Sequence, residues 1–243
     1  MKWRQWLFPK GDTYARSRLL YLRGLGIIYG IAFLSWWVQA PALVGSHGLV
    51  PMAEFLDAAG ESLHVQGLSR WGGLPTVFWL NDSDASLHVV CGLGVLLSVA
   101  VVAGFAVGPC LAALWFLYLS LVGTGDVFMR FQWDILLLEA GFLAIFFAPW
   151  RRLRLQWRGV PPPLGWGERI ALWLQWWLIA KLMFQSGWVK LAWATPDQPE
   201  WWPDISAMTF HYVTQPLPTW TAWWMHQLPE WFHKAEIWPM YAV

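Results

Sequence analysis

The sequence predicts an all-α membrane protein with about five transmembrane helices, and three observations carry that prediction. Of the 243 residues, 57% are hydrophobic and only 13% are charged, about half the charged fraction of a soluble domain. The apolar residues gather in five long runs separated by polar segments. The chain also holds 23 Trp, a residue that favours the membrane–water interface. The net charge of +1 gives no indication of nucleic-acid binding.

The apolar runs place the elements in order. A basic segment, residues 1–23, precedes a first span at 25–44, about the 20 residues that a bilayer requires. Four further spans are predicted at 87–107, 110–122, 133–148 and 170–190. Together the five spans form a helical membrane domain over residues 24–191.

Two features of the first spans bear on packing. Gly26 and Gly30 form a GxxxG pair, which either lets a second helix approach closely or is simply tolerated in an apolar helix. Residues 45–86 are expected to form a long polar loop, and Gly108-Pro109 a tight turn between the second and third spans.

The two cysteines are too few for a disulfide framework. Cys91 and Cys110 begin consecutive antiparallel spans, so their thiols are expected on opposite membrane sides, roughly 25 Å apart. A disulfide requires Cα atoms within about 7 Å. We interpret both as small apolar packing residues.

The distribution of basic residues predicts the orientation. They concentrate in residues 1–23 and 151–169, whereas the other connecting segments hold few. Because basic residues flank spans on the inner side, we expect the N-terminus inside. Residues 192–243 then lie outside, as an aromatic and Pro-rich segment of interfacial helices broken at prolines.

Four ionisable residues fall at membrane depth, where such groups usually pair or line a cavity: Asp134, Glu139, Lys181 and Lys190. Glu139 and Lys181 are expected at the same depth, and so are Asp134 and Lys190, with Asp126 as an alternative partner of Lys190. One interpretation is a set of structural ion pairs that fixes the packing of spans four and five. The other is an outward-opening polar pocket that uses Lys190 and nearby histidines.

Asp126, Arg130 and Asp134 recur every four residues and are expected on one helical face. His211, His226 and His233 lack the spacing of metal ligands, so we expect no metal. No motif indicates a cofactor.

Several stretches resemble one known family: WWVQAPALVGSHGLVP (36–51), LPTVFWLNDSDASLH (74–88), GDVFMRFQWDILLLEAGFLAIFFAP (125–149), FQSGWVKLAW (184–193) and TFHYVTQPLPTWTAWWMHQLPEWFHK (209–234). Together they resemble lipase maturation factor family proteins, in the family's order.

The resemblance implies a multi-span protein that assists an exported lipase client, and leaves the oligomeric state open. It implies the endoplasmic reticulum membrane in a eukaryote and the inner (cytoplasmic) membrane in a bacterium. The family pattern continues beyond Lys234, so the outer segment is expected to be shortened. The surface expected to meet a client comprises Trp201, Trp202, His211, Tyr212, Gln215 and His226.

A more distant similarity, to the vitamin K-dependent gamma-carboxylase, implies an alternative function. Its Gly-x-x-Lys-Leu motif is matched by Gly187 to Leu191, which makes Lys190 the base of a membrane enzyme. Asp134 or His211 would assist it. A purely structural membrane scaffold is a third possibility.

Overall fold

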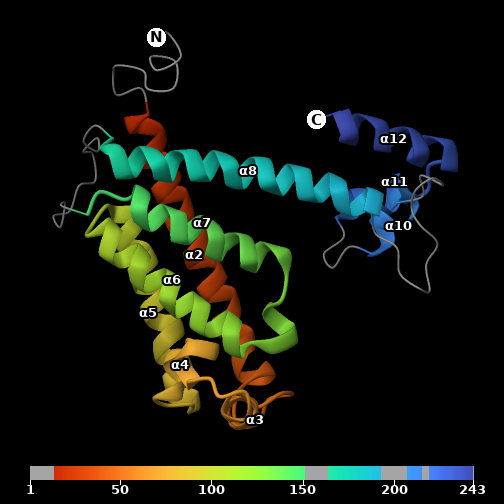
Figure 1. Ribbon diagram of the computed structural model, residues 1–243. Helices are drawn as coiled ribbons and strands as arrows, with labels where there is room; N and C mark the ends of the chain where they lie inside the picture. The colour runs from red at the N-terminus through yellow and green to blue at the C-terminus, as the bar shows by residue number, and fades with distance from the viewer. Residues whose placement is uncertain (1–13, 151–163, 193–206, 215–218, 243) are drawn as a thin grey trace. The chain divides into compact units, whose positions relative to one another are not determined.

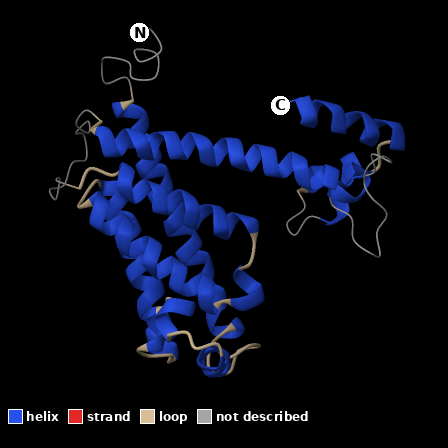
Figure 2. Ribbon diagram, in the orientation of Figure 1, coloured by secondary structure: helices blue, strands red, loops and turns tan. Residues whose placement is uncertain are grey.

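The computed structural model describes residues 14–150, 164–192, 207–214 and 219–242 (Figure 1). Their regular structure is helical throughout, without a strand among the described residues (Figure 2). The chain divides into two compact units, Met1–Gln175 and Trp176–Val243. The expected all-α class is therefore confirmed.

Four helices form the bundle of the first unit: α2 (Ala15–Leu43), α5 (Asp84–Ala103), α6 (Val107–Thr124) and α7 (Gln132–Phe147). Helix α2 packs along α5, α5 against α6, and α6 against α7 (Figure 1). Short connections join α5, α6 and α7, so these neighbours run antiparallel. The first residues of α8 (Trp166–Ala192) also belong to this unit.

Residues 45–86 are not the loop that the sequence predicts, because much of this segment is helical. It contains α3 (Met52–Val65), α4 (Arg70–Gly73) and the 3₁₀-helix η1 (Val77–Trp79). Polar residues are abundant here because α3 is amphipathic, burying Met52 and Leu56 and exposing its acids. The side chain of Ser120 on α6 accepts a hydrogen bond from the Val77 N–H at 3.1 Å, which fixes η1 to the bundle.

The turn between α5 and α6 lies earlier than predicted, at Gly104 rather than Gly108-Pro109. Gly104 has φ 81°, and the Phe105 N–H donates to the Ala100 carbonyl at 2.9 Å, as in a Schellman cap. Pro109 falls in the first turn of α6, where a missing N–H costs little.

The GxxxG pair lies in the α2–α5 contact, which decides between its two interpretations. A Cβ at Gly26 would lie 2.9 Å from Val101 Cγ1, and one at Gly30 would lie 2.8 Å from Ser98 Oγ. A side chain at either glycine would force Val101 or Ser98 to move, so the pair forms a close-contact face between α2 and α5.

Three described helices are long and apolar enough to cross a membrane: Arg16–Leu43, Asp84–Ala103 and Val107–Thr124. They correspond to the first three predicted spans and support the expected integral membrane protein. Helix α7 has 16 residues, and α8 has 27 but carries more polar side chains, so the fourth and fifth spans stay predictions. Both cysteines are free and buried, as their packing role predicts.

The second unit contains the later part of α8 and three short helices, α10 (Ala207–Thr214), α11 (Trp220–His226) and α12 (Glu230–Ala242). Helix α10 packs against both α11 and α12. Its described core includes Met208, Ala222, His233 and Ile237.

Candidate functional site

Asp134 is a buried carboxylate inside the bundle. It lies in the first turn of α7, where the partial positive charge of the helix N-terminus favours an anion. The Tyr118 hydroxyl, on α6, donates a hydrogen bond to Asp134 Oδ1 at 2.5 Å. A hydrogen bond to a charged acceptor is stronger than one between neutral groups. Asp134 therefore joins α6 to α7.

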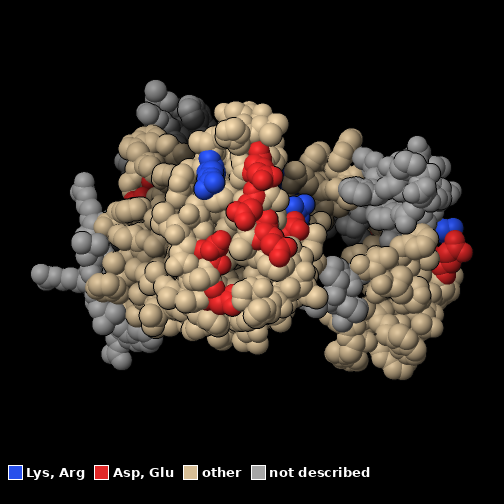
Figure 3. All heavy atoms as spheres, turned by 90° about the horizontal axis from the view of Figure 1, so that it is seen from below, with Lys and Arg blue, Asp and Glu red and all other residues tan. Residues whose placement is uncertain are grey.

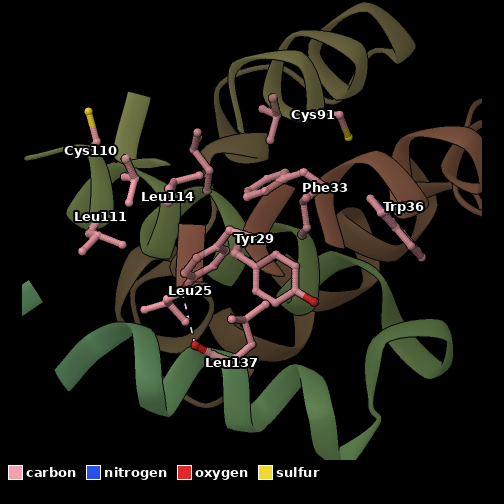
Figure 4. Close-up of a cluster of buried hydrophobic side chains, with 14 of the residues drawn as sticks. Leu25, Tyr29, Phe33, Trp36, Cys91, Cys110, Leu111, Leu114 and Leu137 are labelled. Atoms are coloured by element: carbon pink, nitrogen blue, oxygen red, sulfur yellow. Dashed lines mark hydrogen bonds between the residues drawn. The ribbon is translucent and has the colours of Figure 1, made fainter. Parts of the chain in front are cut away.

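An aromatic cluster encloses this pair. The Tyr29 ring contacts the Tyr118 ring edge-on, with centroids 5.7 Å apart, and Phe33 lies 5.6 Å from the same ring. The Tyr29 hydroxyl donates to the Leu137 carbonyl at 3.2 Å, the dashed line in Figure 4. Gly141 provides the room for that hydroxyl, which a Cβ there would overlap.

This packing bears on both interpretations of the residues at membrane depth. The Asp134 carboxylate is engaged by Tyr118, a partner that carries no charge. Such an arrangement suits a residue that holds helices together. Sequence reasoning singled out Asp134 but missed Tyr118, because no local pattern links two residues on different helices.

Asp126, Arg130 and Asp134 do not share a helical face, contrary to expectation. Asp126 begins the 3₁₀-helix η2 (Asp126–Met129), and Arg130 lies in the non-helical connection between η2 and α7. Arg130 Nη2 still reaches Asp126 Oδ1 at 2.8 Å. This ion pair is largely exposed on its Arg side, so its contribution to stability is small.

The remaining predicted partners fall in different compact units or outside the described side chains. Lys190 lies in α8, and its side chain is outside the described residues. Asp134 and Glu139 belong to the first unit, whereas Lys181 and His211 belong to the second. The pairing of Glu139 with Lys181 and the convergence of Lys190, Asp134 and His211 stay predictions.

The predicted client surface is described only in part. Trp201, Trp202 and Gln215 lie outside the described residues. Tyr212 is half-buried, and its hydroxyl donates toward Glu236, 2.9 Å from Oε1 and 3.0 Å from Oε2. Burial and the bonded carboxylate raise the pKa of Tyr212 to about 12. Tyr212 thus links α10 to α12.

Histidine positions differ within the second unit. His211 and His226 are half-buried, whereas His233 is only 2% exposed. The His226 and His233 rings stack with centroids 6.5 Å apart. No group of three or more potential metal ligands occurs among the described residues.

One end of the first unit carries an acidic surface. Figure 3 shows acidic side chains in a band across this end, and α3 contributes Glu54, Asp57 and Glu61. Asp84 accepts hydrogen bonds from the Ser46 N–H at 2.8 Å and the Ser46 hydroxyl at 2.6 Å. These bonds join the end of α2 to the start of α5. We call residues 45–83 the cap.

Arg18 joins three helices at the opposite end of the bundle. Its Nε donates to the Phe147 carbonyl at 2.8 Å, and its Nη2 meets Glu168 Oε1 at 2.5 Å. The guanidinium also lies over the Phe147 ring, 5.2 Å from the centroid. The beginnings of α2 and α8 and the end of α7 therefore meet here.

The fold and these sites define a helical membrane protein that bears an acidic cap at one end of its bundle. Comparison of the chain with known families makes the assignment specific. Residues 16–243 match the family model described as the lipase maturation factor transmembrane domain, and the chain belongs to the lipase maturation factor family. The resemblance stated from the sequence is thus confirmed.

Curated relatives agree with this assignment. The chain is 39% identical to lipase maturation factor 2 of Gallus gallus in an alignment 242 residues long, which covers 96% of this chain and 32% of that protein. It is 36% identical to lipase maturation factor 1 of Bos taurus over 236 residues, 93% of this chain and 40% of that protein. It is 38% identical to lipase maturation factor 2 of Homo sapiens over 234 residues, 90% of this chain and 31% of that protein. The chain thus spans about a third of the length of these relatives, and no solved structure matches it.

Proposed function

We propose that the chain is a five-span membrane module that assists the folding or assembly of an exported lipase or a similar client. The observation that carries the proposal is the family match across residues 16–243. The names of the relatives connect that family with lipase maturation.

The proposed topology has the N-terminus inside and the cap outside. Arg18 joins the beginning of α2 to the end of α7 and the beginning of α8. The described parts of the two basic segments, residues 14–23 and 164–169, therefore lie at one end of the bundle, and the acidic cap lies at the other. Such an asymmetry favours the basic end as the inner one. The outer side is the lumen of the endoplasmic reticulum in a eukaryote and the periplasmic side in a bacterium.

The cap is the part of the outer side that suits a client. Its described surface combines acidic groups with solvent-exposed apolar side chains, including Val65 at 87% and Leu80 at 79% exposure. Exposed apolar side chains among polar ones are a feature of protein-binding sites. The cap is also held firmly to the bundle through Ser46 and Ser120, so it would present a preformed surface.

A secretion assay tests this function. The full chain is co-expressed with a secreted lipase in cells deprived of their own maturation factor, and lipase activity per amount of secreted lipase is measured. The variant Val65→Ser/Leu80→Ser is expected to lower this specific activity several-fold. Gln66→Ala, an exposed change on the same cap, should leave it unaltered.

Two results would overturn the proposal. One is full specific activity of every co-expressed lipase when the chain is absent. The other is a loss in the Gln66→Ala control equal to that in the double variant. Membrane insertion and the amount of protein are compared by immunoblot of the membrane fraction in all cases.

A further inference from the structure

The short helices of the second unit are apolar on their outward faces. In α12, His233 and Ile237 point into the unit and are 2% and 1% exposed. Trp231 and Trp238, seven residues apart, lie on the opposite face at 69% and 55% exposure. An outward helix face in water is normally polar. This one is built from indoles, with the small residue Ala235 between them.

Helix α11 repeats the pattern. Ala222 is its buried residue, at 5% exposure. Trp220, Trp223 and Trp224 occupy the other side with the spacing i, i+3 and i+4, and their exposures are 80%, 60% and 62%. Two separate helices therefore turn small or medium-sized residues inward and their largest apolar residues outward.

Contacts within the unit fix which face is outward. The hydrogen bonds from Tyr212 to Glu236 hold α12 against α10. Lys234 Nζ forms an ion pair with Glu230 Oε1 at 2.6 Å, one turn apart along α12. This charged pair flanks the Trp231 face and gives α12 a polar edge beside its apolar one. A rotation that buried the indoles would break the Tyr212 bonds.

We propose that these outward Trp faces of α11 and α12 rest in the headgroup–acyl boundary of the bilayer, on the outer side. The inference rests on the proposed topology and assigns particular helix faces to the interfacial helices that the sequence predicts for residues 192–243. These faces differ from the client surface expected from the sequence, because Tyr212 is half-buried and bonded to Glu236, and the half-buried His226 stacks on His233.

Residue type and chain continuity favour lipid as the occupant. Indole has an apolar body and one N–H donor, which suits the boundary between water and hydrocarbon. The same unit begins with α8, whose Trp177 and Phe184 are exposed at 67% and 69%, so an apolar surface precedes the short helices in the chain. A charged stripe beside an apolar stripe is the arrangement of helices that lie in the membrane plane.

Spin-label accessibility in vesicles tests the inference. The full chain carrying Trp231→Cys, and separately Trp224→Cys, is labelled with a nitroxide and reconstituted into phosphatidylcholine vesicles. Lys234→Cys is the matched control on the polar edge of α12. Both native cysteines are buried, and parent protein treated with the same nitroxide reagent checks whether they react.

The expected result is a several-fold higher ratio of oxygen to water-soluble nickel-complex collisions at positions 231 and 224 than at 234. Equal ratios at all three positions overturn the inference, because they place the indole faces in water. Strong immobilisation with shielding from both reagents also overturns it, because protein then covers the faces. The lipase secretion assay of the same variants is an independent measurement. If positions 231 and 224 show no preference for oxygen while the lipase is still activated, only this inference is refuted. If they show the preference while the chain does not activate the lipase, only the proposed function is refuted.

Discussion

The Tyr118 hydroxyl is the side-chain hydrogen-bond donor of the buried Asp134. The carboxylate is 6% exposed and accepts from Tyr118 across the α6–α7 contact. A buried polar group that loses its partner keeps the cost of desolvation, whereas removal of both partners is close to neutral. The pair is therefore expected to respond differently to single and double changes.

Tyr118→Phe is expected to lower the free energy of unfolding by about 1–3 kcal/mol, because it leaves Asp134 buried without its donor. The double variant Tyr118→Phe/Asp134→Leu is expected to regain most of that loss. Unfolding in detergent, followed by circular dichroism, measures both. A Tyr118→Phe protein as stable as the parent would show that the hydrogen bond contributes nothing.

Tyr212 makes a pH-dependent prediction in the second unit. Its pKa is raised from 10.0 to about 12 by burial and by Glu236. The folded state thus retains the phenolic proton over a range in which the unfolded state loses it. The stability that this provides is complete below pH 10 and declines as the pH rises from about 10 to 12.

The titration of Tyr212 can be isolated by difference. Tyrosinate absorbance of the parent minus that of Tyr212→Phe is expected to rise with a midpoint near pH 12. Glu236→Gln removes the negative charge and should lower that midpoint. A midpoint at the ordinary value of 10 in the parent would contradict the contact between α10 and α12.

At the scale of elements, helix positions followed from the sequence better than helix limits. The first span was expected at residues 25–44, and α2 runs from Ala15 to Leu43. The helix begins about ten residues before the expected span. Arg18 was placed before that span because of its charge, but it lies within α2, where Glu168 and the Phe147 carbonyl bind its guanidinium. The turn at Gly104 was missed although glycine is the usual residue at such a cap.

The α2–α5 contact makes an element-scale prediction with an internal control. Gly26→Leu is expected to lower the free energy of unfolding by about 1–3 kcal/mol, because the added side chain meets Val101 and forces the helices apart. Gly24→Leu adds the same side chain where no atom lies within 4 Å of a Cβ. Thermal unfolding in detergent compares the two, and equal effects would argue against the close-contact face.

For the whole molecule, the decisive property is which end of the bundle faces inward. Gln66→Cys in the cap and Gly167→Cys at the start of α8 mark opposite ends, and both positions are exposed. In sealed vesicles of known orientation, an impermeant maleimide is expected to label position 66 from the outer side. Position 167 should react only after permeabilisation. Reversed labelling would invert the topology, and labelling of both from one side would exclude it.

Much of the fold class and the family could be read from the chain itself. Apolar run length, basic-residue asymmetry and Trp content are properties of local sequence, and they indicated a helical membrane protein. The stretches at 125–149 and 209–234 likewise carried the family resemblance without reference to structure.

Only the tertiary structure decided which side chains meet and which face outward. Tyr118 and Asp134 are 16 residues apart, and Arg18 and Glu168 are 150 apart. Such pairs depend on how helices pack, which leaves no periodic trace along the chain. The Trp residues of α11 and α12 show the same division: their number was evident from composition, whereas their outward orientation follows from the inward packing of Ala222, His233 and Ile237.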